Sequence, residues 1–397
     1  MRKVYLDHSA TTPVDRRVVE AMLPYLTEKF GNASSVHQFG QEARAANDRA
    51  RRQVATLIGA RANEIIFTSG GTEANNLAIR GVCELAESHG RHIITSSIEH
   101  PSVRGTVELL EKRGWVVTRL PVYDDGIVRT EDVSSALRPD TVLVSVMMAN
   151  NEIGTIQPIN EIGEVVKEAR RNGHRYLWLH TDAVQAAGRL PIDVDHSNCD
   201  LLSISAHKIY APKGSGALFV RRGVRLAPQQ VGGHQERERR AGTESIANIV
   251  AFGAAAELAS REMAERNEHT RRLRDRFESS VVASIDDFAF NGDRERRLPH
   301  LSNISFRFIE GEGLLIHLDM QGVAVSTGSA CSSGPLEPSP VIRALGRDEE
   351  LARGAIRFSF GKDNTDDDVD YAVEALQRSV KSLRKLSPLS RETVAVS

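Results

Sequence analysis

The feature that most constrains the fold is a series of short apolar runs separated by longer stretches with helical periodicity. Apolar residues follow one another in these runs instead of alternating with polar ones, so both faces of each strand should be buried. Such strands, separated by helices, predict an α/β fold with a mostly parallel central sheet covered by helices on both faces. The predicted strands are residues 64–68, 92–95, 115–118, 142–146, 176–179, 201–204 and 217–220.

A smaller α+β unit is predicted after this series. Residues 244–277 have the pattern of one long helix that leaves the sheet. Strand patterns at 301–306 and 355–360, a helix near 313–321 and an amphipathic helix over 366–386 follow it. Since 397 residues are many for one core, we expect two domains. The predicted large domain is residues 15–260, and the predicted small domain is residues 1–14 and 261–397.

Composition and charge exclude several functional classes. The formal net charge of -2 provides no attraction to nucleic acid or to an anionic membrane. No stretch approaches the roughly 18 apolar residues of a membrane span, and the N-terminus lacks the apolar core of a signal peptide. Cys83, Cys199 and Cys331 are too scattered for a disulfide framework or a zinc site. We therefore expect a cytoplasmic protein that has no metal site of its own and no direct nucleic-acid or membrane binding.

Lys208 is the first candidate for covalent chemistry. It ends the run Ser-Ala-His-Lys at 205–208, directly after a predicted strand and before a glycine-rich loop. An amine desolvated in a cleft loses its proton and can form a Schiff base. Taken alone, a solvated surface lysine is the commoner case.

Other polar residues follow neighbouring strands. Residues 69–73 lead into a helix, and their backbone amides with the hydroxyl of Thr72 suit a phosphate, although simple helix capping is the alternative. Asp182 suits a cationic ring nitrogen, Asn151 an oxygen anion, and His100 stacking or proton transfer. A helix cap, a turn and a loop histidine are their simpler interpretations. Because the carboxyl ends of parallel strands meet at one edge, these signals converge with Lys208 and together predict a pyridoxal 5'-phosphate enzyme.

Cys331 lies in a run of small, polar residues at 326–335. Such surroundings favour an exposed thiol that reaches a substrate and carries a product away, with an incidental loop thiol as the alternative. The apolar neighbours of Cys83, and those of Cys199, instead indicate buried structural cysteines.

These motifs resemble those of the cysteine desulfurases, which are fold-type I pyridoxal-phosphate enzymes of the class-V aminotransferase family. The chain resembles the subgroup with a long cysteine loop, over nearly its whole length to about Leu386. The matching stretches are residues 5–13, 67–73, 150–154, 182–185, 205–208, 240–243 and 328–331.

The resemblance implies a role for each candidate residue. Lys208 forms the Schiff base with pyridoxal 5'-phosphate, His100 stacks on its ring, Asp182 pairs with the ring nitrogen and Gln185 contacts the ring hydroxyl. Asn151 belongs to the same pocket. The implied phosphate ligands are Gly71, Thr72, Ser205 and His207, with Thr243 from the second subunit of a homodimer. Asn32 and Arg357 are implied to bind the α-carboxylate of the substrate.

The implied reaction removes sulfur from L-cysteine, leaving L-alanine and a persulfide on Cys331, with His100 as the candidate acceptor for the thiol proton. Sulfur then passes to an acceptor such as an iron–sulfur scaffold protein, and Cys331 could transiently ligate a cluster. Thiolated tRNA, a cofactor and modified DNA are the alternative destinations of the sulfur. Alternatives are another pyridoxal-phosphate enzyme, such as a selenocysteine lyase or an aminotransferase, and an inactive scaffold protein of this fold.

Overall fold

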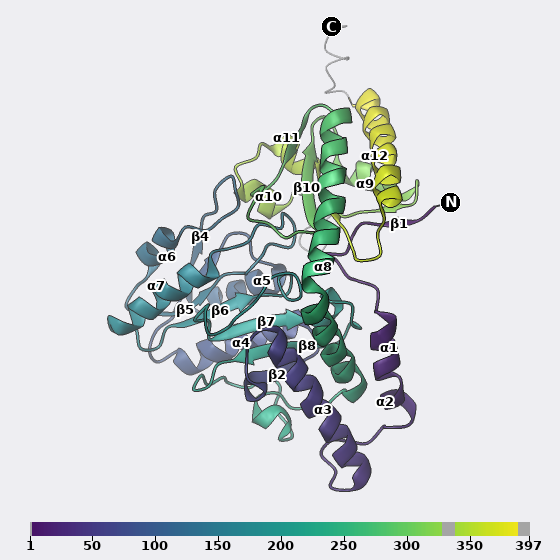
Figure 1. Ribbon diagram of the computed structural model, residues 1–397. Helices are drawn as coiled ribbons and strands as arrows, with labels where there is room; N and C mark the ends of the chain where they lie inside the picture. The colour runs from purple at the N-terminus through teal and green to yellow at the C-terminus, as the bar shows by residue number, and fades with distance from the viewer. Residues whose placement is uncertain (1, 328–337, 388–397) are drawn as a thin grey trace.

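A seven-stranded sheet forms the centre of the molecule in the computed structural model, which describes residues 2–327 and 338–387. Its strands are β2 (Ile65–Thr68), β3 (His92–Ser96), β4 (Val116–Leu120), β5 (Thr141–Ser145), β6 (Trp178–Asp182), β7 (Leu201–Ser205) and β8 (Gly216–Val220). Their order is β2-β8-β7-β6-β5-β3-β4, and β8 alone runs opposite to its neighbours in this sheet (Figure 1). The predicted mostly parallel sheet is therefore confirmed.

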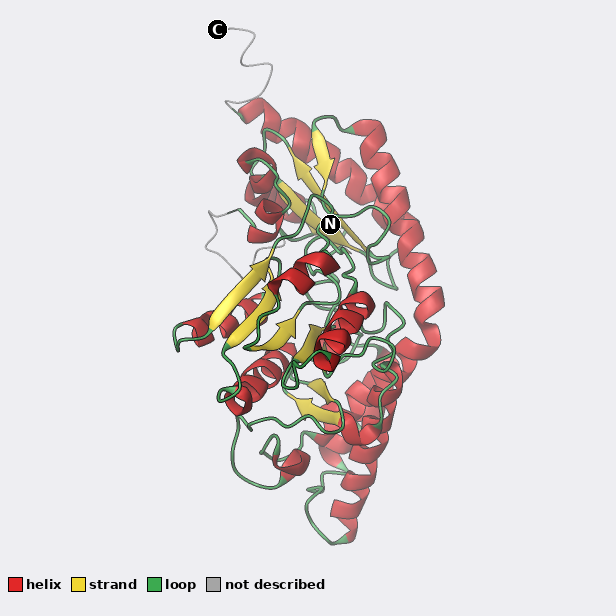
Figure 2. Cartoon of the chain, turned by 90° about the vertical axis from the view of Figure 1, so that its left-hand side faces the viewer, coloured by secondary structure: helices red, strands yellow, loops and turns green. Residues whose placement is uncertain are grey.

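Helices cover both faces of this sheet, and in Figure 2 the strands lie between them. Successive side chains of a strand lie on opposite faces of the sheet and pack in different cores. On β8, Phe219 packs in the core that includes residues of α3, α7 and α8, while Leu218 packs in the core that includes residues of α4. Burial on both faces explains why the strand sequences are continuously apolar. The helices around the sheet are α1 (Arg16–Met22), α2 (Pro24–Thr27), α3 (Gln38–Leu57), α4 (Gly71–Ala86), α5 (Pro101–Glu111), α6 (Thr130–Ala136), α7 (Ile159–Arg171) and α8 (Ile246–Ser284).

A separate hydrophobic core lies beyond the sheet. Its antiparallel strands are β9 (Phe288–Phe290), β10 (Leu301–Phe306) and β12 (Ala355–Ser359), while β1 (Val4–Tyr5) pairs in parallel with β11 (Val323–Ala324). Helices α9 (Gly311–Asp319) and α12 (Asp366–Leu386) pack in it, whereas α10 (Pro340–Ala344) and α11 (Glu349–Arg353) contribute Val341, Ile342 and Ala352 to the core that includes Phe219. Helix α8 extends from the large sheet to this part of the molecule (Figure 1). It has 39 residues, so it is about 58 Å long, and it contributes Phe252 to the first core and Phe277 to this one.

Some predicted boundaries were wrong. Strand β6 begins and ends later than residues 176–179, so Asp182 is its last residue instead of following it. Helix α8 continues seven residues past the predicted end at 277, because Val281 still packs in the second core. The division of the chain at residues 14 and 260 stays a prediction. Within residues 2–327 and 338–387, no helix combines the length and the apolar character that crossing a membrane requires.

Candidate active site

A cavity of about 620 Å³ lies where the parallel strands end. Asp182 and Ser205, the last residues of β6 and β7, both line it, which is the ligand edge expected of such a sheet. The structure thus gathers polar groups that are far apart in the sequence. The predicted site residues that line the cavity are Gly71, Thr72, His100, Asn151, Asp182, Gln185, Ser205, His207, Lys208 and Arg357.

Lys208 ends a short 3-10 turn that follows β7. Its Nζ donates hydrogen bonds to the backbone oxygens of Ser9 and, at 2.7 Å, Ala10. Burial, and then the positive charges of Arg357 and Arg189, lower the pKa of the amine to about 7. A large fraction of Lys208 is therefore unprotonated near neutral pH, as a nucleophile or a base requires.

Asn75 connects Asp182 to the residues around His100, and neither Asn75 nor Ser102 was predicted from the sequence. The Asn75 Nδ2 donates to Asp182 Oδ2 at 2.7 Å and to Ser102 Oγ at 2.8 Å. Asn75 is 1% exposed on α4, one turn after Gly71, whereas the side chain of its neighbour Asn76 donates to the backbone oxygen of Thr72 in its own helix.

The ring of His100 has a defined hydrogen-bonding role. Its Nδ1 accepts from the backbone N–H of Ser102 at 3.1 Å, and burial lowers the pKa of the ring. A neutral imidazole whose Nδ1 accepts carries its proton on Nε2. In this arrangement His100 can donate only through Nε2. To accept the thiol proton, as expected from the sequence, its Nδ1 would first have to lose the hydrogen bond from Ser102.

Gln185 presents a buried acceptor to the cavity. Its Nε2 donates to the backbone oxygen of Ser9 at 2.9 Å, while its Oε1 has no partner among the described residues. Asp182 accepts from the backbone N–H of Val184 at 2.9 Å, which orients the carboxylate without neutralising it. An uncompensated acceptor and a carboxylate in one cavity match a ring that carries a hydroxyl donor and a cationic nitrogen.

The start of α4 forms the other end of the cavity. A Cβ on Gly71 would lie 2.7 Å from a methyl group of Val184, and one on Gly216 would lie 2.6 Å from the backbone of Gly70. The chain therefore needs glycine at position 71, where Val184 approaches the start of α4, and at position 216, where β8 approaches Gly70. Burial lowers the pKa of His207 to about 4, so this ring is neutral at physiological pH. Free backbone N–H groups at a helix N-terminus suit a phosphate.

Arg357 is buried on β12 and is already partly engaged. Its Nη2 lies 2.6 Å from Asp7 Oδ1, and its Nη1 donates to the backbone oxygen of Asn151 at 2.9 Å. Its Nε has no partner among the described residues. A carboxylate ligand would therefore bind a guanidinium that Asp7 already holds in place.

Two predicted site residues that the structure describes, Asn32 and Thr243, do not line the cavity. Asn32 is exposed and accepts from the backbone N–H of Ser34 at 2.9 Å, and Thr243 is also exposed. Cys331 lies outside the described residues. Cys83 and Cys199 are fully buried, which raises the pKa of both thiols, that of Cys199 to about 12, as expected of structural cysteines.

Comparisons with known proteins agree with this geometry. The family model "Aminotransferase class-V" matches residues 4–372. Proteins named "Cysteine desulfurase IscS" from Dictyoglomus turgidum and Methanosarcina thermophila are 50% and 49% identical, each over 98% of this chain and over 98% and 95% of their own lengths.

Solved structures are also similar to this chain. One titled "NIFS-LIKE PROTEIN" is 36% identical and covers 96% of this chain and 100% of its own, with a TM-score of 0.90. Another, titled "SspA in complex with cysteine", is also 36% identical and covers 91% and 100%, with a TM-score of 0.79. On family model, sequence and structure alike, the chain belongs to the cysteine desulfurases of the class-V aminotransferase family.

Proposed function

We propose that the 620 Å³ cavity binds pyridoxal 5'-phosphate and that the protein uses it to remove sulfur from L-cysteine. The observation that carries this proposal is the buried amine of Lys208, with its pKa near 7, in the same cavity as the carboxylate of Asp182. When bound, the cofactor supplies an electron sink for chemistry at the α-carbon of an amino acid.

Each wall of the cavity would hold a different part of this cofactor. Lys208 would bond covalently to its aldehyde carbon. Asp182 would pair with its ring nitrogen, Gln185 Oε1 would accept from its ring hydroxyl, and His100 and Asn151 would contact the ring. The residues proposed for the phosphate are Gly71, Thr72, Ser205 and His207, with Thr243 from a second subunit.

The side chains of the protein then divide the reaction among them. Arg357 binds the α-carboxylate of L-cysteine, together with Asn32, and so fixes the orientation of the substrate. Lys208, released from the cofactor when the amine of L-cysteine takes its place, would accept the α-proton as a free amine, and His100 would donate from Nε2. Cys331, as a thiolate, attacks the substrate sulfur: a sulfur–sulfur bond forms, the carbon–sulfur bond breaks, and L-alanine leaves after protonation.

A homodimer is part of the proposal. Phe30, Val36 and Phe39 are 69%, 87% and 54% exposed in the single chain, and they lie close in sequence to Asn32. Large exposed apolar side chains are typical of a surface that another subunit covers. In such a dimer, the exposed Asn32 and Thr243 would be able to reach a cofactor cavity across the subunit interface.

The substrate and partners follow from the family. L-cysteine is the proposed substrate, and a structurally similar protein is described by its title as a complex with cysteine. We also propose that the protein works in the cytoplasm and passes persulfide sulfur to an acceptor such as an iron–sulfur scaffold protein.

The purified protein should absorb visible light as a lysine-bound pyridoxal phosphate does, and borohydride should fix the cofactor on the peptide containing Lys208. With L-cysteine and a reductant it should release sulfide and alanine in equal amounts. Cys331→Ser should keep the absorbance and lose sulfide release, whereas Cys199→Ser, the matched control, should keep both. Undiminished sulfide from Cys331→Ser would exclude the persulfide. Release of selenide from L-selenocysteine, without release of sulfide from L-cysteine, would favour a selenocysteine lyase.

A further inference from the structure

A second, much smaller cavity also contacts Lys208. Its volume is about 30 Å³, and its walls include Arg189, Tyr210, Arg266 and Lys362. A water molecule needs roughly 10–15 Å³ by this measure, so the space accommodates about two waters or a single ion of halide size. Three side chains that are positively charged at neutral pH therefore meet Lys208 around a space large enough for one halide ion.

Arg189 is the most unusual member of this group. It is 9% exposed, and its Nη1 donates to the backbone oxygen of Gln185 at 3.2 Å. Within residues 2–327 and 338–387 it forms no ion pair with a carboxylate. A buried cation without a counter-charge is costly, so the surroundings are expected to supply one.

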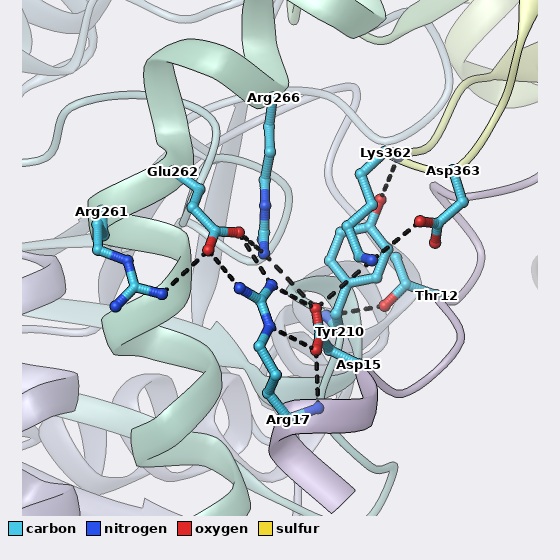
Figure 3. Close-up of polar contacts among 9 residues, drawn as sticks. All are labelled: Thr12, Asp15, Arg17, Tyr210, Arg261, Glu262, Arg266, Lys362 and Asp363. Atoms are coloured by element: carbon cyan, nitrogen blue, oxygen red, sulfur yellow. Dashed lines mark hydrogen bonds and ion pairs between the residues drawn. The ribbon is translucent and has the colours of Figure 1, made fainter.

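Arg266 on α8 and Lys362 in the loop after β12 also line the small cavity. Figure 3 shows both side chains beside Tyr210. They lie over the ring of Tyr210, with 5.1 Å and 5.3 Å from the guanidinium carbon and the Nζ to the ring centroid. Arg266 pairs through Nη2 with Glu262 at 2.7 Å, but its Nε is buried and has no acceptor among the described residues. Arg266 and Arg189 both line the small cavity.

The neighbouring carboxylates do not balance these charges. Asp15 is shared by Arg17 at 2.8 Å, Lys362 at 3.5 Å and Arg266 at 3.9 Å, as Figure 3 shows. The carboxylates of the cluster, Asp15, Glu262 and Asp363, are matched by the three cations Arg17, Arg266 and Lys362, while Arg261 is largely exposed. No carboxylate of the cluster is therefore left to balance Arg189.

We propose that the small cavity binds a monoanion of the halide class, held by Arg189, Arg266 and Lys362. A tetrahedral oxyanion, which is larger than a halide, does not suit a space of about 30 Å³. The site itself does not depend on the proposed function. Its effect on Lys208 follows from charge: an anion beside Arg189 offsets the repulsion between these two cations, so it keeps more of the amine protonated.

The direct test is crystallography of the holoenzyme grown or soaked in bromide. Bromide scatters anomalously, so an anomalous peak is expected in this cavity in the wild type. Arg189→Gln should lose the peak, while Arg261→Gln, which removes an exposed charge from the same helix as Arg266, should keep it. A water molecule in place of the peak, or a peak that survives Arg189→Gln, would overturn the proposal.

A solution measurement covers the case in which Arg189→Gln does not fold. At constant ionic strength, replacing potassium gluconate by potassium chloride at tenfold its dissociation constant should raise the midpoint of thermal unfolding by about 1–2 °C. Arg261→Gln should respond as the wild type does, and Arg266→Gln should respond less. An equal midpoint in both salts for the wild type would refute the site, whatever the desulfurase assay shows.

Discussion

The lowered pKa of Lys208 has a measurable consequence for the cofactor-free protein. Burial, Arg357 and Arg189 lower this pKa from 10.5 to about 7, whereas the unfolded chain keeps the ordinary value. Between these two pH values the unfolded state therefore binds more protons than the folded state. Stability rises with pH wherever this holds, by up to about 1.4 kcal/mol per pH unit and roughly 4–5 kcal/mol over the window.

Lys208→Met removes the titrating group and keeps a side chain of similar length. In urea unfolding of the cofactor-free proteins, the variant should be most stable relative to wild type near pH 7. Its advantage should shrink by about 1.4 kcal/mol for each pH unit toward pH 10. The variant also loses the hydrogen bonds to Ser9 and Ala10, which shifts its stability in the opposite direction, so the slope against pH is the decisive quantity.

Lys213→Met is the matched control, because Lys213 is an exposed lysine in the same loop. Its stability should follow that of the wild type at every pH. If the curves of wild type and Lys208→Met were parallel between pH 7 and 10, the amine would have its ordinary pKa, and the argument that burial prepares it for reaction would fail.

Three further outcomes are expected. Asn75→Ala removes the donor to Asp182 Oδ2, so the affinity for pyridoxal 5'-phosphate should fall about tenfold in an absorbance titration, while Asn76→Ala should leave it unchanged. An unaffected affinity would contradict the link from Asn75 to the cofactor site. Asp7→Asn weakens the contact that positions Arg357, so KM for L-cysteine should rise about tenfold in steady-state kinetics with a smaller change in kcat. A change in kcat alone would argue against positioning. Cys83 and Cys199 are fully buried, so mass spectrometry after brief alkylation of the native protein should find both unmodified.

The polar residues at the strand ends could be predicted because geometry forces them together. Parallel strands deliver their carboxyl ends to one edge, so Asp182, Ser205 and His100 had to approach one another once the strands were recognised. The predicted site residues on these segments line the cavity for that reason.

The end of β6 could not be predicted in the same way. His180 interrupts the apolar run, yet it is fully buried inside the sheet. Its Nδ1 lies 2.8 Å from Ser145 Oγ on β5 and its Nε2 lies 3.1 Å from Ser203 Oγ on β7. These partners on neighbouring strands satisfy the ring, and a single-strand pattern contains no information about them. The role of Asn75 was missed for a similar reason, since its two partners lie 27 and 107 residues away in the sequence.

The position of the Lys208 amine is not a property of its own loop. Both carbonyls that accept from it belong to residues 9 and 10, which follow a strand of the second core. Thr12 also hydrogen-bonds to the backbone before and after Lys208. Its Oγ1 donates to the backbone oxygen of His207 at 2.9 Å and accepts from the backbone N–H of Tyr210 at 2.8 Å.

Tyr210 itself has a left-handed backbone with φ of 71°, a conformation that costs a residue with a side chain on the order of 1–2 kcal/mol. It is tolerated because Thr12 holds its N–H and the backbone N–H of Asp15 binds its carbonyl at 3.0 Å. The N-terminal segment therefore both maintains the bend after the lysine and fixes the amine. Since β1 anchors that segment in the second core, the chemistry at the edge of the large sheet depends on the packing of a core that contributes few residues to the cavity.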